Sequence, residues 1–180
     1  MLRLIIPPNE KYDEFNGKFI DFHGATIQLE HSLVSISKWE QKWHKPFLTR
    51  EKKTIPETID YIRCMTLTQN VPPEVYDNLT DKNIEQVNEY IENPMTATWF
   101  SEEDDKSGGK EIITNEIIYY WMISLNIPVE FQKWHLNHLL TLIRVCNLKN
   151  APQKKMSKKE LAARNRKLNE QRRAAMKSKG

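Results

Sequence analysis

The segment TNEIIYYWMISLNIPVEFQKWHLNHLLTLIRVC, residues 114–146, contains the longest apolar windows of the chain. After Thr114 the large apolar side chains recur at helical spacing, and Pro128 begins a second pattern of the same kind. The first pattern consists of Ile117, Ile118, Trp121, Met122 and Leu125, and the second of Phe131, Trp134, Leu139, Leu142, Ile143 and Cys146. We expect a central hairpin of two helices. Burying one such side chain is worth about 1.5–3 kcal/mol, so this hairpin is expected to decide whether the domain folds.

Shorter helices are predicted on the N-terminal side of this segment. Ser32 is a suitable N-cap for a helix that Pro46 ends. The inner face of that helix carries Leu33, Ile36, Trp39 and Trp43. Residues 54–57, TIPE, form a capping box with proline in the first turn, where its missing N–H costs nothing. Pro73 begins a short helical piece, and Thr80 can cap a further helix.

The N-terminus is predicted to contain the β structure of the protein. Leu2–Ile6 is a short apolar run, and residues 24–30 alternate apolar and polar side chains as a half-buried strand does. The stretch Phe15–Phe22, with Asn16-Gly17 as a turn signal, could supply a third strand. We therefore predict a mainly α fold: a compact helical domain with a small N-terminal antiparallel β element and a basic C-terminal helical tail.

The charge distribution predicts two parts. Residues 151–180 contain eleven Lys and Arg against two Glu, a net charge of +9, whereas residues 1–150 have a net charge of −6. The net charge of the whole chain, +3, hides this asymmetry. The change of sign indicates a boundary between two parts of the chain near residue 150. We expect an acidic helical body with the N-terminal β element over residues 1–150, and a linker and basic, mobile helix over residues 151–180.

The predicted tail helix has too thin an apolar stripe to dock firmly on the body. Leu161 and Leu168 are one heptad apart, and Ala175 completes the row. An isolated helix of this length is marginal in water, so we expect a partner to order it. Three roles remain open: binding phosphates through its eleven cations, binding an acidic or amphipathic protein surface, and solubilising the chain without a partner.

No motif for catalysis or cofactor binding is found in the sequence. The glycine-rich phosphate loops and the nucleophile elbow are absent. His135 and His138 are spaced to share a metal, but further ligands are missing nearby, so we expect no metal site. We therefore expect no enzyme and no cofactor. The chain shows no signal peptide and no apolar run long enough to cross a bilayer, so we expect neither a membrane partner nor secretion.

Five stretches resemble a family of small proteins encoded by long-tailed, siphovirus-type bacteriophages. They are residues 29–40 (LEHSLVSISKWE), 43–47 (WHKPF), 61–66 (YIRCMT) and 95–100 (MTATWF), and the closing pattern of residues 156–180. The resemblance spans nearly the whole chain and is to tail assembly chaperones.

The resemblance implies a role in binding without catalysis, in the host cytoplasm. Tail assembly chaperones coat the tape measure protein and help to recruit tail tube protein. On this interpretation the helical body presents an apolar groove or face to amphipathic tape measure helices, and the basic tail contacts a second partner. The candidate partner-binding residues are Trp39, Trp43, Trp99, Phe100, Leu161, Arg164, Arg166, Lys167, Leu168, Arg172 and Arg173.

Two other functions stay open at this point. A nucleic-acid-binding protein acting through residues 151–180 would lose affinity steeply as salt is raised. A structural tail or connector subunit would be present stoichiometrically in finished particles, where a chaperone would be absent. The sequence also leaves self-association into a homo-oligomer open.

Overall fold

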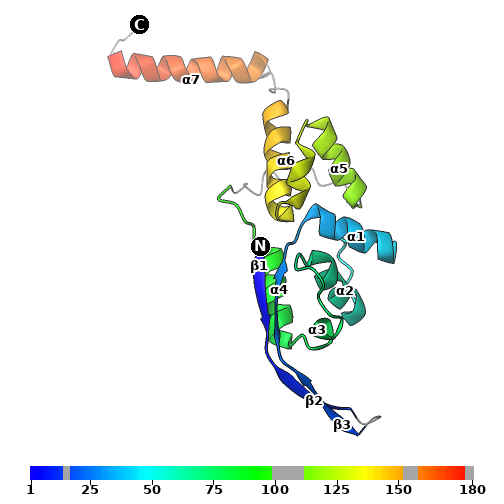
Figure 1. Ribbon diagram of the computed structural model, residues 1–180. Helices are drawn as coiled ribbons and strands as arrows, with labels where there is room; N and C mark the ends of the chain where they lie inside the picture. Colours follow the sequence, from blue (N-terminus) through cyan, green and yellow to red (C-terminus); the bar gives the residue numbers. More distant parts are fainter. Residues whose placement is uncertain (14–16, 99–111, 152–157, 177–180) are drawn as a thin grey trace. The chain divides into compact units, whose positions relative to one another are not determined.

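The computed structural model describes residues 1–13, 17–98, 112–151 and 158–176 (Figure 1). Helices account for most of these residues, and a small antiparallel β element lies at the N-terminus, which confirms the predicted fold class. The chain divides into two compact units, Met1–Asn147 and Leu148–Gly180.

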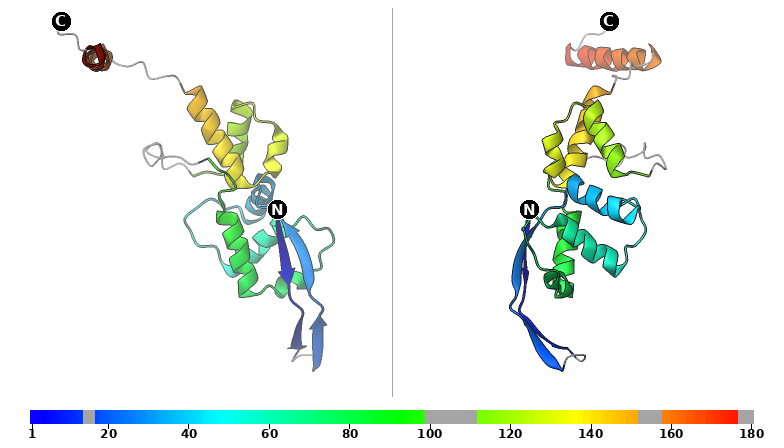
Figure 2. Two further views of the ribbon diagram at one scale, coloured as in Figure 1. Left: turned by 90° about the vertical axis from the view of Figure 1, so that its left-hand side faces the viewer. Right: turned by 45° about the vertical axis from the view of Figure 1, so that its right-hand side comes forward.

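The β element consists of two ladders that follow one another along a bent hairpin. Strand β1 (Leu2–Ile6) pairs antiparallel with β4 (Ala25–Leu29), and β2 (Asn9–Asp13) pairs antiparallel with β3 (Lys18–Phe22). Alternate side chains of the first ladder enter the core, namely Leu4, Ile6, Ile27 and Leu29. The β2–β3 ladder buries no side chain of its described residues fully, and Figures 1 and 2 show it extending beyond the helices. We call it the arm.

The predicted strands of residues 2–6 and 24–30 are confirmed, and the third falls at Lys18–Phe22. The sequence analysis missed β2, because its residues NEKYD lack the apolar alternation of a half-buried strand. The structure explains why this alternation is missing: the described residues of the arm form no buried face, so apolar and polar side chains need not alternate.

Helices α1 (Leu33–Trp43) and α2 (Ile55–Met65) begin at the predicted caps. The Ser32 side chain accepts a hydrogen bond from the Ser35 backbone N–H, and the Thr54 side chain accepts one from that of Glu57. Each capping box is closed by a return bond, in which the backbone N–H of the N-cap residue donates to the side chain of the third helical residue. Helix α1 ends at His44, whose φ of 52° gives the left-handed turn that stops the helix.

Two further helices follow α2 along the chain, and the second of them packs against β1. Helix α3 (Glu74–Asp77) follows Pro73, and α4 (Asp81–Glu92) begins at Thr80 with a capping box closed by Asn83. The Asn83 side-chain amide also donates to the Ile5 carbonyl oxygen at 2.9 Å, which fastens α4 to β1.

The continuous helix predicted after Pro128 is wrong. A 3₁₀ helix, η2 (Val129–Lys133), comes first, and α6 (Leu136–Asn150) begins after a break. At the break His135 forms a β-bridge with Ser32, and the Leu136 N–H donates to the His31 carbonyl oxygen at 2.7 Å. This long-range pairing competes successfully with the local helical hydrogen bonds.

The core is centred on β1, β4, α1 and α2 rather than on the expected helical hairpin. Side chains that are completely buried come mostly from these four elements, including Leu4, Leu29, Leu33, Ile36 and Ile62. Helix α5 (Asn115–Ser124) contributes Ile118 and Met122 but leaves Tyr120 and Ile123 exposed. Its N-terminus is fixed by the buried Glu40 carboxylate, which accepts hydrogen bonds from the backbone N–H groups of Asn115 (2.9 Å) and Phe47 (2.6 Å).

The second unit contains α7 (Lys158–Met176). Leu168 is 39% exposed, and Arg166, Lys167 and Arg172 are exposed as well. In the part of the chain that the structure describes, no helix is both long and apolar enough to span a membrane.

Candidate partner-binding groove beside Trp43

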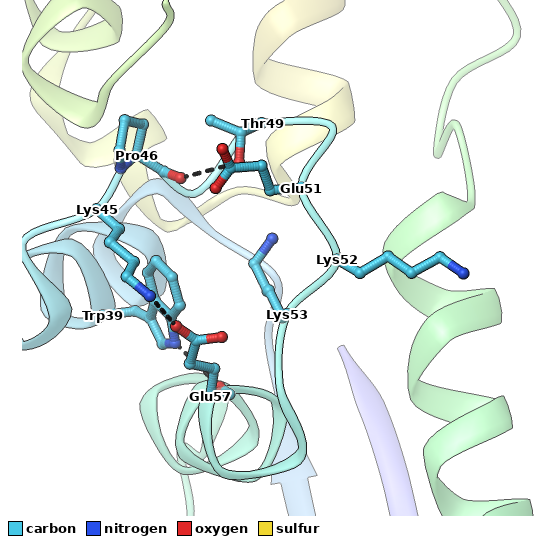
Figure 3. Close-up of a pocket in the computed structure, with 8 residues that line it drawn as sticks. All are labelled: Trp39, Lys45, Pro46, Thr49, Glu51, Lys52, Lys53 and Glu57. Carbon is cyan, nitrogen blue, oxygen red and sulfur yellow. Dashed lines mark hydrogen bonds and ion pairs between the residues drawn. The ribbon is translucent and has the colours of Figure 1, made fainter.

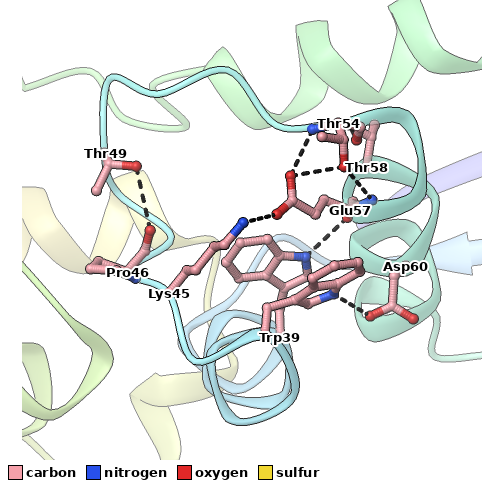
Figure 4. A network of polar contacts seen from close by, with 9 residues as sticks. Trp39, Lys45, Pro46, Thr49, Thr54, Glu57, Thr58 and Asp60 are labelled. Atoms are coloured by element: carbon pink, nitrogen blue, oxygen red, sulfur yellow. Dashed lines mark hydrogen bonds and ion pairs between the residues drawn. The ribbon is translucent and has the colours of Figure 1, made fainter.

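The two tryptophans of α1 differ in exposure. Trp39 is 1% exposed and its indole N–H donates to the Glu57 carbonyl oxygen at 3.0 Å (Figure 4). The rings of Trp39 and Trp43 stack with their centroids 6.1 Å apart. Trp39 therefore lies on the inner face of α1, as expected, and its selection as a partner-binding residue is wrong, because the packing of α2 against α1 buries its ring.

Trp43 lies half-buried at the edge of the same interface. Its indole N–H donates to Asp60 Oδ2 at 2.9 Å, and Lys42 Nζ forms an ion pair with Asp60 Oδ1. Since α1 supplies Trp43 and Lys42 and α2 supplies Asp60, these bonds hold the ring in one orientation. A fixed aromatic ring loses little conformational entropy on binding a partner.

A groove of about 330 Å³ opens beside Trp43, and we call it the Trp43 groove. Ile55, Pro56 and Ile59 from the first two turns of α2 complete its apolar lining, and Lys42, Asp60 and Arg63 lie around it. Ile55 is 73% exposed, so the groove offers apolar surface that the folded chain leaves in water. Because Lys42 is paired with Asp60, the groove's main offer to a partner is its apolar lining, which suits the apolar face of an amphipathic helix.

A second pocket, of about 140 Å³, is lined in part by Trp39 (Figure 3). Lys45 Nζ pairs with Glu57 Oε1 at 2.7 Å, and this bond, with further bonds from Thr54, lowers the pKa of Glu57 to about 2. Lys53 Nζ donates to the Phe47 carbonyl oxygen at 2.9 Å and lies 4.0 Å from the Phe47 ring centroid. Burial lowers the pKa of Lys53. Lys45, Glu57 and Lys53 thus already have partners within the chain. Their bonds stabilise the loop between α1 and α2.

The structure brings together few of the residues that the sequence analysis selected. Trp43 lines the groove, whereas Trp99 and Phe100 lie outside the described residues. The tail candidates Leu161, Arg164, Arg166, Lys167, Leu168, Arg172 and Arg173 all lie in α7.

Sequence reasoning missed Ile55 and Ile59 as groove residues. Ile55 precedes the proline of the capping box and lies in the first turn of α2, before the residues of the helix's inner face. An apolar residue outside the inner face was the available signal of an apolar surface. Among the described residues, no group of three or more His, Cys, Asp and Glu side chains could hold a metal ion.

Comparisons of the chain with protein-family models, with curated proteins and with solved structures found no match. The resemblance to tail assembly chaperones therefore rests on the sequence stretches quoted above.

Proposed function

We propose that this protein is a non-enzymatic assembly chaperone of a long-tailed bacteriophage and that it binds amphipathic helices of the tape measure protein in the Trp43 groove. The observation that supports this proposal is the apolar groove itself, with Trp43 held by Asp60 and with Ile55 largely exposed. The resemblance in residues 29–40, 43–47, 61–66 and 95–100 suggests the identity of the partner.

The groove offers enough apolar surface for weak, repeated binding. Covering one large apolar side chain is worth about 1.5–3 kcal/mol, and part of that gain is offset by the ordering of both partners. A single groove of this size therefore gives a modest affinity per helix. Modest affinity suits a chaperone, because tube protein must later displace it from the tape measure protein.

In this proposal the basic helix α7 recruits tail tube protein. Its exposed Arg166, Lys167 and Arg172 would increase the association rate with an acidic surface, and salt would weaken the effect. The groove and α7 lie in different units of the chain, so each can be removed without the other.

Affinity purification from phage-infected cells tests the proposed partners. The full chain and a chain ending at Asn150 would be compared with and without nuclease, and mass spectrometry would identify the bound proteins. We expect tape measure protein with both chains and tube protein with the full chain alone. Recovery of mainly nucleic acid that depends on residues 151–180 would contradict the proposal, and so would stoichiometric presence of the protein in finished particles.

A charge placed in the groove tests the binding site. We expect Ile55→Asp to weaken binding of tape measure helices by about tenfold or more, because it puts a carboxylate among the apolar lining residues. The substitution should leave folding intact, since Ile55 is exposed and an acidic residue is favourable in the first turn of a helix. Titration of labelled tape measure fragments, followed by fluorescence anisotropy, measures the change.

The matched control is Ile123→Asp, which alters an isoleucine that is 75% exposed on α5 and does not line the groove. Binding should stay within about twofold of the wild-type value, because surface substitutions away from a site change free energies by about 0.5 kcal/mol or less. Equal losses in both variants would place the binding site elsewhere.

A further inference from the structure

The arm carries an aromatic pair that the described part of the chain leaves uncovered. Tyr12 and Phe19 face one another across β2 and β3, with ring centroids 5.0 Å apart. They are 56% and 65% exposed. Large aromatic side chains are usually at least partly buried in a folded protein or in its complexes.

The next pair on the same face of the arm consists of two carboxylates. Glu10 lies opposite Asp21, two residues from the aromatic pair, so alternation places all four side chains on one face. Like charges that face one another across a ladder are destabilising. Neither carboxylate forms an ion pair with any described residue, and a hollow of about 370 Å³ lies beside them. Lys11 belongs to the opposite face, where its Nζ donates to the Asp77 carbonyl oxygen at 2.8 Å.

Helix α7 has the complementary pattern. Leu168 is followed one turn later by the exposed Arg172, and these Cα positions are about 6 Å apart along the helix axis. On a strand, residues two positions apart are about 6.7 Å apart, which is close to the Leu168–Arg172 spacing. When Leu168 lies on the aromatic pair, Arg172 therefore lies at the carboxylate pair. Arginine also stacks well on aromatic rings, which an exposed tyrosine and phenylalanine permit.

Helix α7 and the arm belong to different compact units of the chain. A contact within one copy would leave the protein monomeric, whereas a contact between copies makes its association depend on concentration.

We propose that α7 of one copy lies across the arm of a second copy, with Leu168 against Tyr12 and Phe19 and Arg172 between Glu10 and Asp21. The contact joins unlike surfaces, so it leaves a free arm at one end and a free α7 at the other, and the copies associate head to tail. The net charges of −6 on residues 1–150 and +9 on residues 151–180 favour this arrangement. The inference does not rest on the proposed function, because it uses neither the Trp43 groove nor a phage partner.

Analytical ultracentrifugation of the nuclease-treated full chain in low salt tests this contact. We expect concentration-dependent association of the wild-type protein that weakens as salt is raised. An arm variant, Glu10→Arg with Asp21→Arg, and a tail variant, Arg166→Glu with Arg172→Glu, should each associate at least about tenfold more weakly. A chain carrying all four substitutions should associate again, because the charges have changed places.

Mixing the two variants gives the sharpest result. The arm variant keeps an intact α7 and the tail variant keeps an intact arm, so an equimolar mixture can form one productive contact. We expect a 1:1 heterodimer and nothing larger. The matched control, Glu85→Arg with Glu89→Arg on exposed positions of α4, makes the same charge change as the arm variant and should keep the association of the wild-type protein.

Three outcomes would overturn the proposal. The first is a wild-type protein that stays monomeric up to about 100 μM, well above the micromolar range of weak specific interfaces. The second is a mixture of the two variants that stays monomeric. The third is a control that loses association as strongly as the arm variant, since the attraction would then be a general effect of charge. Circular dichroism of each variant checks that the fold is unchanged.

Discussion

At the scale of single residues, a pair of buried histidines connects the end of β4 to the start of α6. His31 Nδ1 and the Tyr61 hydroxyl lie 2.5 Å apart, and the ring centroids of His31 and His135 are 5.1 Å apart. His135 Nε2 bonds to the Tyr90 carbonyl oxygen at 3.0 Å. Burial is the main cause that lowers the pKa of both imidazoles, and that of His31 falls to about 3. These rings are neutral structural groups at pH 7.

The lowered pKa of His31 predicts acid-sensitive stability. The unfolded chain binds a proton at this residue below about pH 6.5, whereas the folded chain resists protonation until about pH 3. The free energy of unfolding therefore falls as pH is lowered through this window, by about 2 kcal/mol between pH 7 and pH 5 from His31 alone. His135 contributes in the same direction. Urea denaturation at several pH values measures the slope.

The variant His31→Asn removes the titrating group and should show a correspondingly smaller loss of stability between pH 7 and pH 5. It will be less stable than wild type at neutral pH, because the imidazole bond to Tyr61 is lost. An unchanged slope in this variant would show that other groups cause the acid sensitivity.

At the scale of elements, the bend between the arm and the first ladder depends on Gly24. Its φ is +81°, and a Cβ at this position would lie 3.0 Å from the Ile6 carbonyl oxygen and 3.1 Å from the Pro8 nitrogen. The bend lies where Pro7 and Pro8 interrupt the ladder, since proline has no N–H to donate. The glycine thus allows two ladders to follow one another at an angle.

We predict that Gly24→Ala destabilises the protein by about 1–3 kcal/mol, since it adds steric contact with backbone atoms to an unfavourable φ. Gly17→Ala is the matched control. Gly17 also has a positive φ, of 62°, but the nearest atom to an added Cβ is the Tyr12 hydroxyl oxygen at 3.9 Å. Chemical denaturation of both variants separates the two causes. An equal cost in both would mean that the backbone angle alone matters.

At the scale of the whole molecule, every fully buried apolar residue among those described lies between Leu4 and Leu139. We therefore predict that a chain ending at Asn150 melts within about 2 °C of the full chain, because a change of 1 kcal/mol shifts the midpoint by roughly 2–8 °C in domains of this size. Differential scanning calorimetry of both chains tests this. A large drop in the melting temperature would show that the basic segment stabilises the body.

The helix starts at Ser32, Thr54 and Thr80 were predictable from the sequence, because capping depends on residues three positions apart. Two of the strands and the change of charge near residue 150 were also predictable, because periodicity and composition are local properties of the sequence. The candidate site was predictable in part: Trp43 was selected for its aromatic ring, whereas the position of Ile55 outside the inner face of α2 was the one local sign of the groove.

Tertiary structure decided which apolar faces are covered. Trp39 and Trp43 belong to one helical stripe, yet packing of α2 buries the first and leaves the second beside a groove. The long-range bonds of His31 and His135 ended a helix that the local pattern favoured. Tyr12 and Phe19 of the arm are likewise exposed, which the local pattern of their strands does not specify. Local patterns determine which helix or strand a segment can form. Burial depends on contacts with residues that are distant in sequence, and a local pattern does not specify those contacts.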